Sequence, residues 1–119
     1  MEPSDPLVLA LTTEANSIRA KALAESLLEQ GLAACISLLP VTSLYQWNGE
    51  LCDEAEVQLL IKTRQSLLQA LEQNVLERHS YDLPEWICWP VGCSTAYGRW
   101  AEQQLRPSPN QEDAEPQAP

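Results

Sequence analysis

Hydrophobic and polar residues follow two periods along this chain, a short one typical of β-strands and a longer one typical of amphipathic helices. Short, mostly apolar runs predict strands at 7–12, 32–39, 55–63 and 86–91, with extended structure resuming between 41 and 47. Apolar residues spaced three and four positions apart predict helices at about 16–30, 64–79 and 95–106. The elements therefore follow the order strand, helix, strand, strand, helix, strand, with a short closing helix.

Turn and capping residues place the boundaries of these elements. Asn16 is a favourable N-cap and Gly31 a favourable C′ residue for the first helix. Pro40 cannot donate a backbone hydrogen bond to a central ladder, so it is expected to interrupt the extended segment. Asn48 and Gly49 both tolerate a positive φ and predict a tight hairpin turn between two strands.

The order of the elements predicts an α+β fold of the ferredoxin-like type, β-α-β-β-α-β, in which helices cover one face of an antiparallel sheet. The other face of such a sheet meets water, so its strands should alternate apolar and polar residues. The runs at 7–11, 33–36 and 86–91 are instead apolar on both faces. Because two helices cover only one face, we expect other copies of the same chain to cover the second face.

The length and composition indicate one globular domain. The chain has 119 residues, and 45% of them are hydrophobic, which is ordinary for a folded protein. We assign residues 1–106 to this domain. Residues 107–119 are rich in proline and acidic residues and contain no large apolar side chain, so we expect a disordered tail there.

The charge and the apolar runs narrow the choice of partners. With 17 acidic and 7 basic residues, the net charge of −10 disfavours nucleic acid as a partner. No apolar run reaches membrane-spanning length or has the flanks of a signal peptide, so no membrane partner is expected. The four cysteines form no C-x-x-C pair and predict reduced thiols in a cytoplasmic protein.

Catalytic motifs are missing from the sequence. The chain lacks G-x-S-x-G, P-loop and G-x-G-x-x-G motifs. A dyad of Cys35 and His79 can be drawn on paper, but no third residue is evident that would orient it. The protein is therefore not expected to be an enzyme.

Four short motifs stand in a recognisable order along the predicted elements. They are LAAC at 32–35, SLYQWNGE at 43–50, IKT at 61–63 and HSYDLPE at 79–85. Together they resemble the CutA family of divalent-cation tolerance proteins, and we expect a bacterial member. The resemblance implies a ferredoxin-like subunit, a homotrimer closed by sheet-to-sheet contacts, and a link to copper and other divalent metals. It also implies a likeness to the nitrogen-regulatory PII proteins in subunit fold and assembly.

The chain departs from that family at two proposed copper ligands. Some bacterial members carry a cysteine near the end of the first strand and a second histidine beside the first one. The matching positions hold Thr12 and Arg78, so only His79 of that set is present, and Ser80 stands where proline is frequent. No cofactor is expected to be obligatory, and copper or another divalent metal ion is the candidate ligand.

His79, Glu85 and Cys35 are the candidate metal ligands. A neutral imidazole is a common metal ligand, but at a helix end the ring of His79 can instead bond backbone carbonyls. Pro84 carries the chain from helix into strand, which brings Glu85 near His79. The Glu85 carboxylate can equally be solvated or pair with Lys62. Cys35 is soft enough for copper, although its apolar neighbours favour a core thiol.

Tyr45, Trp47, Lys62 and Tyr81 are the candidate residues of a ligand cleft or subunit interface. Tyr45 and Trp47 are two positions apart on one strand and therefore share a face. They either pack between subunits or form the aromatic wall of a cleft. Lys62 can reach water, pair with a carboxylate or meet an anion. We expect residues 78–86 to form a helix-to-strand junction that lines a crevice between subunits.

Two functions remain open from the sequence. The first is a homotrimer that binds copper or other divalent cations, weakly or at clefts between subunits, in metal homeostasis or signalling. The second is a trimeric PII-like scaffold that binds a small metabolite or a protein segment, with metal binding incidental.

Overall fold

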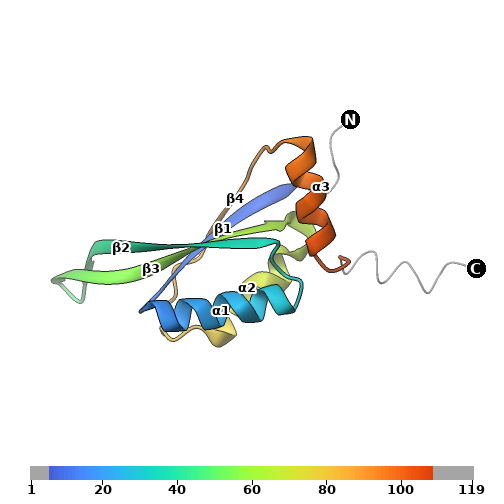
Figure 1. Cartoon of the computed structure of the whole chain (residues 1–119). Helices are drawn as coiled ribbons and strands as arrows, with labels where there is room; N and C mark the ends of the chain where they lie inside the picture. The colour runs from blue at the N-terminus through green and yellow to red at the C-terminus, as the bar shows by residue number, and fades with distance from the viewer. Residues whose placement is uncertain (1–5, 109–119) are drawn as a thin grey trace, which may run out of the picture.

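The strands and helices follow one another in the order that the sequence predicts (Figure 1). The structure, a computed structural model, describes residues 6–108. Its elements are β1 (Leu7–Glu14), α1 (Ser17–Glu29), β2 (Cys35–Trp47), β3 (Glu50–Arg64), a 3-10 turn (Gln65–Leu67), α2 (Leu68–Arg78), β4 (Ile87–Pro90) and α3 (Thr95–Gln104). The sheet has the strand order β2-β3-β1-β4, and all neighbouring strands are antiparallel. The predicted α+β, ferredoxin-like fold is therefore confirmed.

α1 and α2 lie side by side on one face of the sheet and bury its apolar side chains (Figure 1). The buried residues of this core include Ala20, Leu23, Ala24 and Leu27 from α1, Leu71 and Val75 from α2, Ala10 from β1, and Leu59 and Ile61 from β3. On the helices these residues recur at three- and four-residue steps, and on β3 at a step of two. Each element therefore buries the stripe that its own periodicity marks as apolar.

Capping residues fix both ends of α1. The side chain of Asn16 accepts a hydrogen bond from the N–H of Arg19 over 2.9 Å. At the other end Gly31 has a φ of +70°, and the N–H of Leu32 donates to the carbonyl of Leu27 over 3.0 Å. This is the Schellman arrangement, in which a residue without a side chain takes the left-handed conformation and ends the helix.

The predicted interruption of the second strand at Pro40 is wrong. β2 runs without a break from Cys35 to Trp47, and Pro40 pairs with Val57 inside it. β2 is an edge strand, so among residues 6–108 no strand neighbours one side of its backbone. Proline is tolerated at an edge because its missing N–H need not belong to a ladder. The position of the strand in the sheet therefore decides what this proline does.

β2 and β3 extend beyond the rest of the sheet as a two-stranded arm (Figure 1). The pairing of β1 ends at Glu14, whereas β2 and β3 continue to pair as far as Trp47 and Glu50. The predicted Asn-Gly turn closes the arm, with positive φ values of 53° and 79° at its two residues. β3 therefore starts earlier than predicted, because the hairpin also pairs polar residues. We call residues 41–56 the hairpin arm.

The sheet face opposite α1 and α2 is apolar and has little cover within the chain. Directly paired residues of antiparallel strands share a face, so Leu9 lies beside Trp89 and Leu11 lies beside Ile87. Ile87 and Trp89 are 47% and 39% exposed. The surface formed by Leu9, Leu11, Leu39, Leu60, Ile87 and Trp89 is called the open face.

α3 packs at the end of the sheet away from the hairpin arm (Figure 1). Ala101 of α3 and Leu105, which follows the helix, form a small second cluster with Ala34 and Leu67, and Leu7 packs against that cluster. This cluster fastens the C-terminal helix to the start of β1 and the end of β3.

The described chain continues for four residues beyond α3. α3 ends at Gln104, and Ser108 is still only 4% exposed, so buried chain continues past residue 106. The rest of the predicted tail, residues 109–119, lies outside the described residues. Between residues 6 and 108, no helix is both long and apolar enough to cross a membrane.

Three glycines provide a graded test of backbone strain. A Cβ at Gly31 would meet Arg106 atoms at 3.0 Å, at a φ of +70°; at Gly49 it would meet nothing within 4 Å, at a φ of +79°. At Gly92 it would meet nothing, and φ is not in the left-handed region. Alanine should therefore lower the free energy of unfolding by about 2–4 kcal/mol at Gly31, about 1 kcal/mol at Gly49 and less than about 0.5 kcal/mol at Gly92. Urea unfolding followed by circular dichroism measures this order, and equal effects at the three positions would contradict it.

Candidate functional site

A buried carboxylate, Glu14, holds the end of β1 to the junction between α2 and β4. Glu14 is 2% exposed. It accepts hydrogen bonds from the hydroxyl and the N–H of Ser80, at 2.6 and 3.1 Å, and from the N–H of Ala15 at 3.0 Å. Burial alone raises the pKa of Glu14, but these hydrogen bonds outweigh burial and hold that pKa below its ordinary value of 4.5. Glu14 is therefore ionised at neutral pH.

The side chain of His79 is fully buried, and both of its ring nitrogens are engaged. The backbone N–H of Tyr81 lies 3.1 Å from Nδ1. Because an N–H only donates, Nδ1 accepts and carries no proton, so the proton is on Nε2, which donates to the carbonyl of Thr13 over 2.8 Å. Glu14 stands 3.5 Å from Nδ1. One predicted alternative was that the ring of His79 bonds a backbone carbonyl at the helix end. The ring does bond a carbonyl, but this carbonyl belongs to Thr13 of β1 and not to α2.

Two further hydrogen bonds fasten the same junction to the strands. The hydroxyl of Thr13 donates to Glu85, and the hydroxyl of Tyr81 donates to Glu56 over 2.7 Å. The pKa of Tyr81 is raised, first by burial and then by its bond to Glu56 and by the charge of neighbouring carboxylates. Tyr81 therefore remains a donor at neutral pH. Residues 79–85 are held to β1 at both ends and to β3 in the middle.

An open groove of about 1060 Å³ lies between this junction and the hairpin arm. Its lining includes the carboxylates of Glu54, Glu56, Asp82 and Glu85 and the rings of Tyr45, Trp47 and Tyr81. The hydroxyl of Tyr45 donates to Glu54, and this bond, more than burial, raises the pKa of Tyr45 to about 12. With this many carboxylates, the groove favours cations over anions. We call it the hairpin groove.

The structure brings together only part of the predicted site. Tyr45, Trp47, Tyr81 and Glu85 line the hairpin groove, and His79 contacts Tyr81 from the buried side of the junction. The predicted helix-to-strand junction is observed, since α2 ends at Arg78 and β4 starts at Ile87.

Cys35 and Lys62 lie apart from the groove. The Nζ of Lys62 donates to the hydroxyl of Ser37 over 2.6 Å and lies 3.9 Å from the Sγ of Cys35. Both residues are level with Leu9 in the sheet, whereas His79 bonds Thr13. Four residues along a strand span about 13 Å. Cys35 therefore does not join His79, and Lys62 meets a hydroxyl and a thiol in place of the Glu85 carboxylate.

The three predicted ligands do not fit a metal centre built from one chain. A transition-metal site generally needs three or four ligands in a definite geometry. Among residues 6–108, no three His, Cys, Asp or Glu side chains are grouped closely enough to hold an ion. His79 would have to break a bond to offer a nitrogen, and Cys35 lies elsewhere. A metal centre in this region therefore needs ligands beyond those that residues 6–108 of one chain provide.

Sequence reasoning missed Glu14, on which the junction depends. A carboxylate at the end of an apolar strand has the appearance of a solvated terminus. Its burial arises from contact with Ser80, which is 66 positions away along the chain. The only local signal of such a contact is Ser80, which stands where the resembling family often has proline. A hydroxyl at this position can donate a hydrogen bond to a carboxylate.

Glu14→Gln should destabilise the fold more at pH 7 than at pH 3. The pKa of Glu14 in the folded chain lies below 4.5, so its charged form contributes stability above that pH, which is lost as the pH falls through the folded pKa. We expect the free energy of unfolding to fall by about 1–3 kcal/mol at pH 7 and by less at pH 3. Urea unfolding at both pH values measures this, with Glu77→Gln, an exposed carboxylate of α2, as control. A loss that is equal at the two pH values would argue against the charged hydrogen bonds.

Comparison with known proteins agrees with the motifs in the sequence. The chain is 45% identical over 101 residues to the divalent-cation tolerance protein CutA of Pectobacterium atrosepticum, covering 83% of this chain and 92% of that protein. It is 39% identical over 103 residues to the chloroplastic protein CutA of Arabidopsis thaliana, covering 85% of this chain. The chain spans 57% of the length of that plant relative.

The fold and the family model agree as well. The crystal structure of CutA1 from Oryza sativa is similar, with a TM-score of 0.83 and 39% identity, covering 87% of this chain and 96% of that one. The family described as CutA1 divalent ion tolerance protein matches residues 8–104. Because the match includes all but the first residue of β1, the hairpin arm, the junction and all of α3, the chain belongs to the CutA1 divalent ion tolerance protein family.

Proposed function

We propose that this protein works as a homotrimer in divalent-cation tolerance, and that its hairpin groove binds divalent cations weakly once a neighbouring copy closes it. The observation that carries the proposal is the set of four carboxylates, Glu54, Glu56, Asp82 and Glu85, along one open groove. Carboxylate oxygens attract divalent cations, and ligands from a second copy would complete the coordination that one chain lacks. Membership of a family of divalent ion tolerance proteins supports the same role.

The two outer strands and the open face support the proposed assembly. β2 and β4 are the edges of the sheet, and all four residues of β4 are exposed. A contact between the β2 edge of one copy and the β4 edge of the next joins two different surfaces, and such a head-to-tail contact forms a ring when its rotation closes. The resemblance to CutA proteins supports three copies in that ring. Such a ring would bury apolar side chains of the open face, among them Ile87 and Trp89.

The proposed role is binding and not catalysis. The sequence allowed Cys35 and His79 to be drawn as a nucleophile and a base. The structure keeps them apart, because Cys35 lies beside Lys62 whereas His79 bonds Thr13. His79 uses both ring nitrogens in structural bonds. All four cysteines are free thiols, which supports the cytoplasmic location that forms part of the proposal.

A second candidate function is the binding of a small metabolite or a protein segment, with metal incidental. Leu44, Trp47 and Leu83 line the hairpin groove and are 66%, 52% and 71% exposed. Apolar surface beside a few polar groups is typical of sites for organic ligands. A metal titration separates this candidate from the first one.

Ile87→Glu should separate the copies of the proposed homotrimer. A carboxylate at this position would carry a charge into the open face, whose burial without a partner is costly. Sedimentation velocity at low micromolar concentration should show three chains per particle for the wild type and single chains for the variant. Ile18→Glu on α1, where Ile18 is 80% exposed, should leave the trimer intact. A folded wild-type monomer would refute the assembly.

Glu85→Gln should weaken divalent-cation binding at least tenfold, which corresponds to about 1.4 kcal/mol. Glu85 lines the hairpin groove, and the substitution removes a charge while keeping the shape of the side chain. Calorimetric titration with copper or zinc, in the presence of a weak competing chelator, measures the affinity. Glu77→Gln on the exposed side of α2 is the matched control and should not change it. Heats that do not saturate in the wild type would favour the second candidate function.

A further inference from the structure

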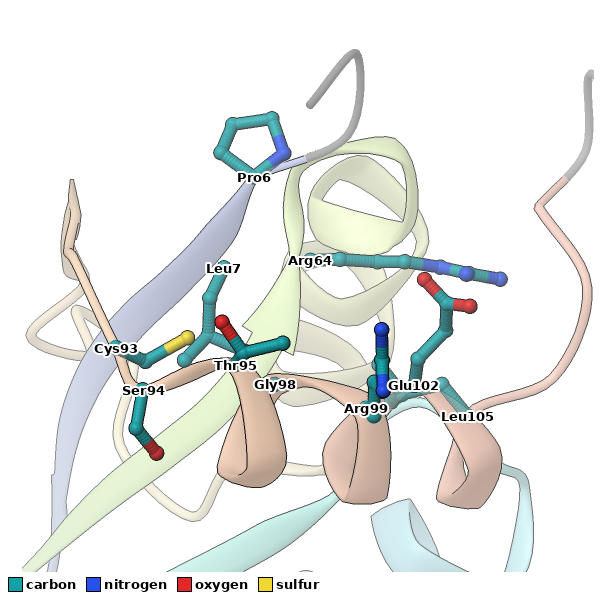
Figure 2. Close-up of a pocket in the computed structure, with 10 residues that line it drawn as sticks. All are labelled: Pro6, Leu7, Arg64, Cys93, Ser94, Thr95, Gly98, Arg99, Glu102 and Leu105. Atoms are coloured by element: carbon teal, nitrogen blue, oxygen red, sulfur yellow. The ribbon is translucent and has the colours of Figure 1, made fainter. Parts of the chain in front are cut away.

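The hairpin groove carries charge of one sign only. Four of the described residues that line it are acidic, and none of them is Lys, Arg or His. A smaller hollow beside α3 differs, because Arg64, Arg99 and Glu102 line it together (Figure 2). A cation in the hairpin groove therefore meets no basic side chain in the lining, and the net charge of −10 adds to the attraction.

The hairpin arm forms one wall of the groove. Tyr45 pairs directly with Cys52, so the two side chains share a face of the sheet. Positions two apart on one strand also share a face, which places Trp47, Glu54 and Glu56 on that same side. The Cα atoms of Glu54 and Glu56 are about 7 Å apart along β3. This wall therefore offers two separated carboxylates and two aromatic rings.

The junction between α2 and β4 forms the other wall, with Tyr81, Asp82, Leu83 and Glu85. The hydroxyl of Tyr81 donates to Glu56 over 2.7 Å and so ties the two walls together. Leu83 is 71% exposed and adds apolar surface between the two carboxylates of this wall. Acidic and apolar side chains therefore stand on both sides of the groove.

The hydroxyl groups around the groove leave its carboxylates able to bind a ligand. Three of these carboxylates accept a hydrogen bond from a hydroxyl, each through one oxygen, Oε1. The donor and acceptor pairs are Tyr45 and Glu54, Tyr81 and Glu56, and Thr13 and Glu85. An ionised carboxylate has two oxygens with about four acceptor sites. Each carboxylate therefore keeps its charge and further sites for a donor.

The spacing of the carboxylates favours a ligand with several separated charges. Among residues 6–108, no three acidic, histidine or cysteine side chains are grouped closely enough to hold one metal ion. Ammonium groups joined by propyl or butyl spacers can instead meet the carboxylates one at a time. An aromatic ring such as that of Trp47 attracts an ammonium group, and exposed apolar side chains such as Leu83 suit the spacers.

We propose that the hairpin groove binds a linear aliphatic polyamine, with its ammonium groups on carboxylates of both walls and its methylene spacers against Trp47 and Leu83. This inference rests on the proposed role of the groove in binding cations, and it names an organic class of cation for it. The polyamine bridges carboxylates that are too far apart to share one ion, so both of its walls come from a single chain.

The test is a calorimetric titration of the full chain with spermidine, at an ionic strength of about 0.15 M that screens weak attraction to the surface. Spermidine should bind with saturable heats and at least about tenfold more tightly than butylamine, which has a similar spacer and one ammonium group. Combining Glu54→Gln with Asp82→Asn removes one charge from each wall and should weaken spermidine binding at least about tenfold. Combining Glu72→Gln with Glu77→Gln removes two exposed charges from α2 and should change it less than about twofold.

A further variant tests the contact with the aromatic ring. Trp47→Ala should weaken spermidine binding at least about threefold, because the ring and its apolar surface are lost, and should change zinc binding less than about twofold. Unchanged affinity for spermidine in this variant would overturn the proposed binding mode.

Three other results would overturn the proposal. They are spermidine heats that do not saturate, butylamine that binds as tightly as spermidine, and an α2 double variant that loses as much affinity as the groove double variant. Zinc titration of the same samples separates this site from the proposed function. Zinc binding without spermidine binding overturns the polyamine site alone, whereas spermidine binding without zinc binding overturns the divalent-cation role alone.

Discussion

The ionised carboxylate of Glu14 is almost fully buried, so the surrounding chain must donate the hydrogen bonds that water would otherwise donate. A buried charge without hydrogen bonds costs several kcal/mol. Ser80 and Ala15 provide the bonds, so the chain that leaves α2 has to return to the end of β1. Once Ser80 is held there, its neighbours His79 and Tyr81 are held as well. The shape of the hairpin groove therefore depends on the hydrogen bonds that stabilise one buried carboxylate, that of Glu14.

β1 has different neighbours at its two ends. Thr13, near the end of the strand, lines the hairpin groove, where four carboxylates gather. Leu7, at its start, packs against the small second cluster that holds α3. The strand between them is buried under α1 on one side and contributes to the open face on the other. The hairpin groove and α3 therefore lie at opposite ends of one strand.

Local signals in the sequence were sufficient for most of the fold. Asn16 and Gly31 place α1, because each acts through contacts within a few residues of itself. The effect of Pro40 was misjudged, because whether a missing N–H matters depends on strand order, and strand order is a property of the whole sheet. The apolar runs on both strand faces correctly indicated a face that the helices do not cover.

The candidate site was predictable only where it depends on sequence neighbours. His79 and Glu85 come near the same strand because a short junction joins them, and both bond Thr13. Cys35 was grouped with them by its chemistry, but register places it level with Leu9. Glu14 gave no sign of its burial, since its partner Ser80 is brought to it by the packing of α2. Residue type indicates what a side chain can do, while register decides what it meets.

The position of β1 has a consequence for how the chain comes to be folded. β1 precedes both of its partner strands in the sequence, yet it lies between β3 and β4 in the finished sheet. Its pairing joins Leu7 to Arg64 and Val8 to Pro90, so long loops must close before either edge is covered. The hairpin arm, in contrast, pairs two strands that are adjacent in sequence, so no long loop has to close before it forms. During synthesis, the apolar side chains of β1 therefore stay exposed until β3 and β4 have been made. Among these strands, β1 is the one that a chaperone would protect for longest.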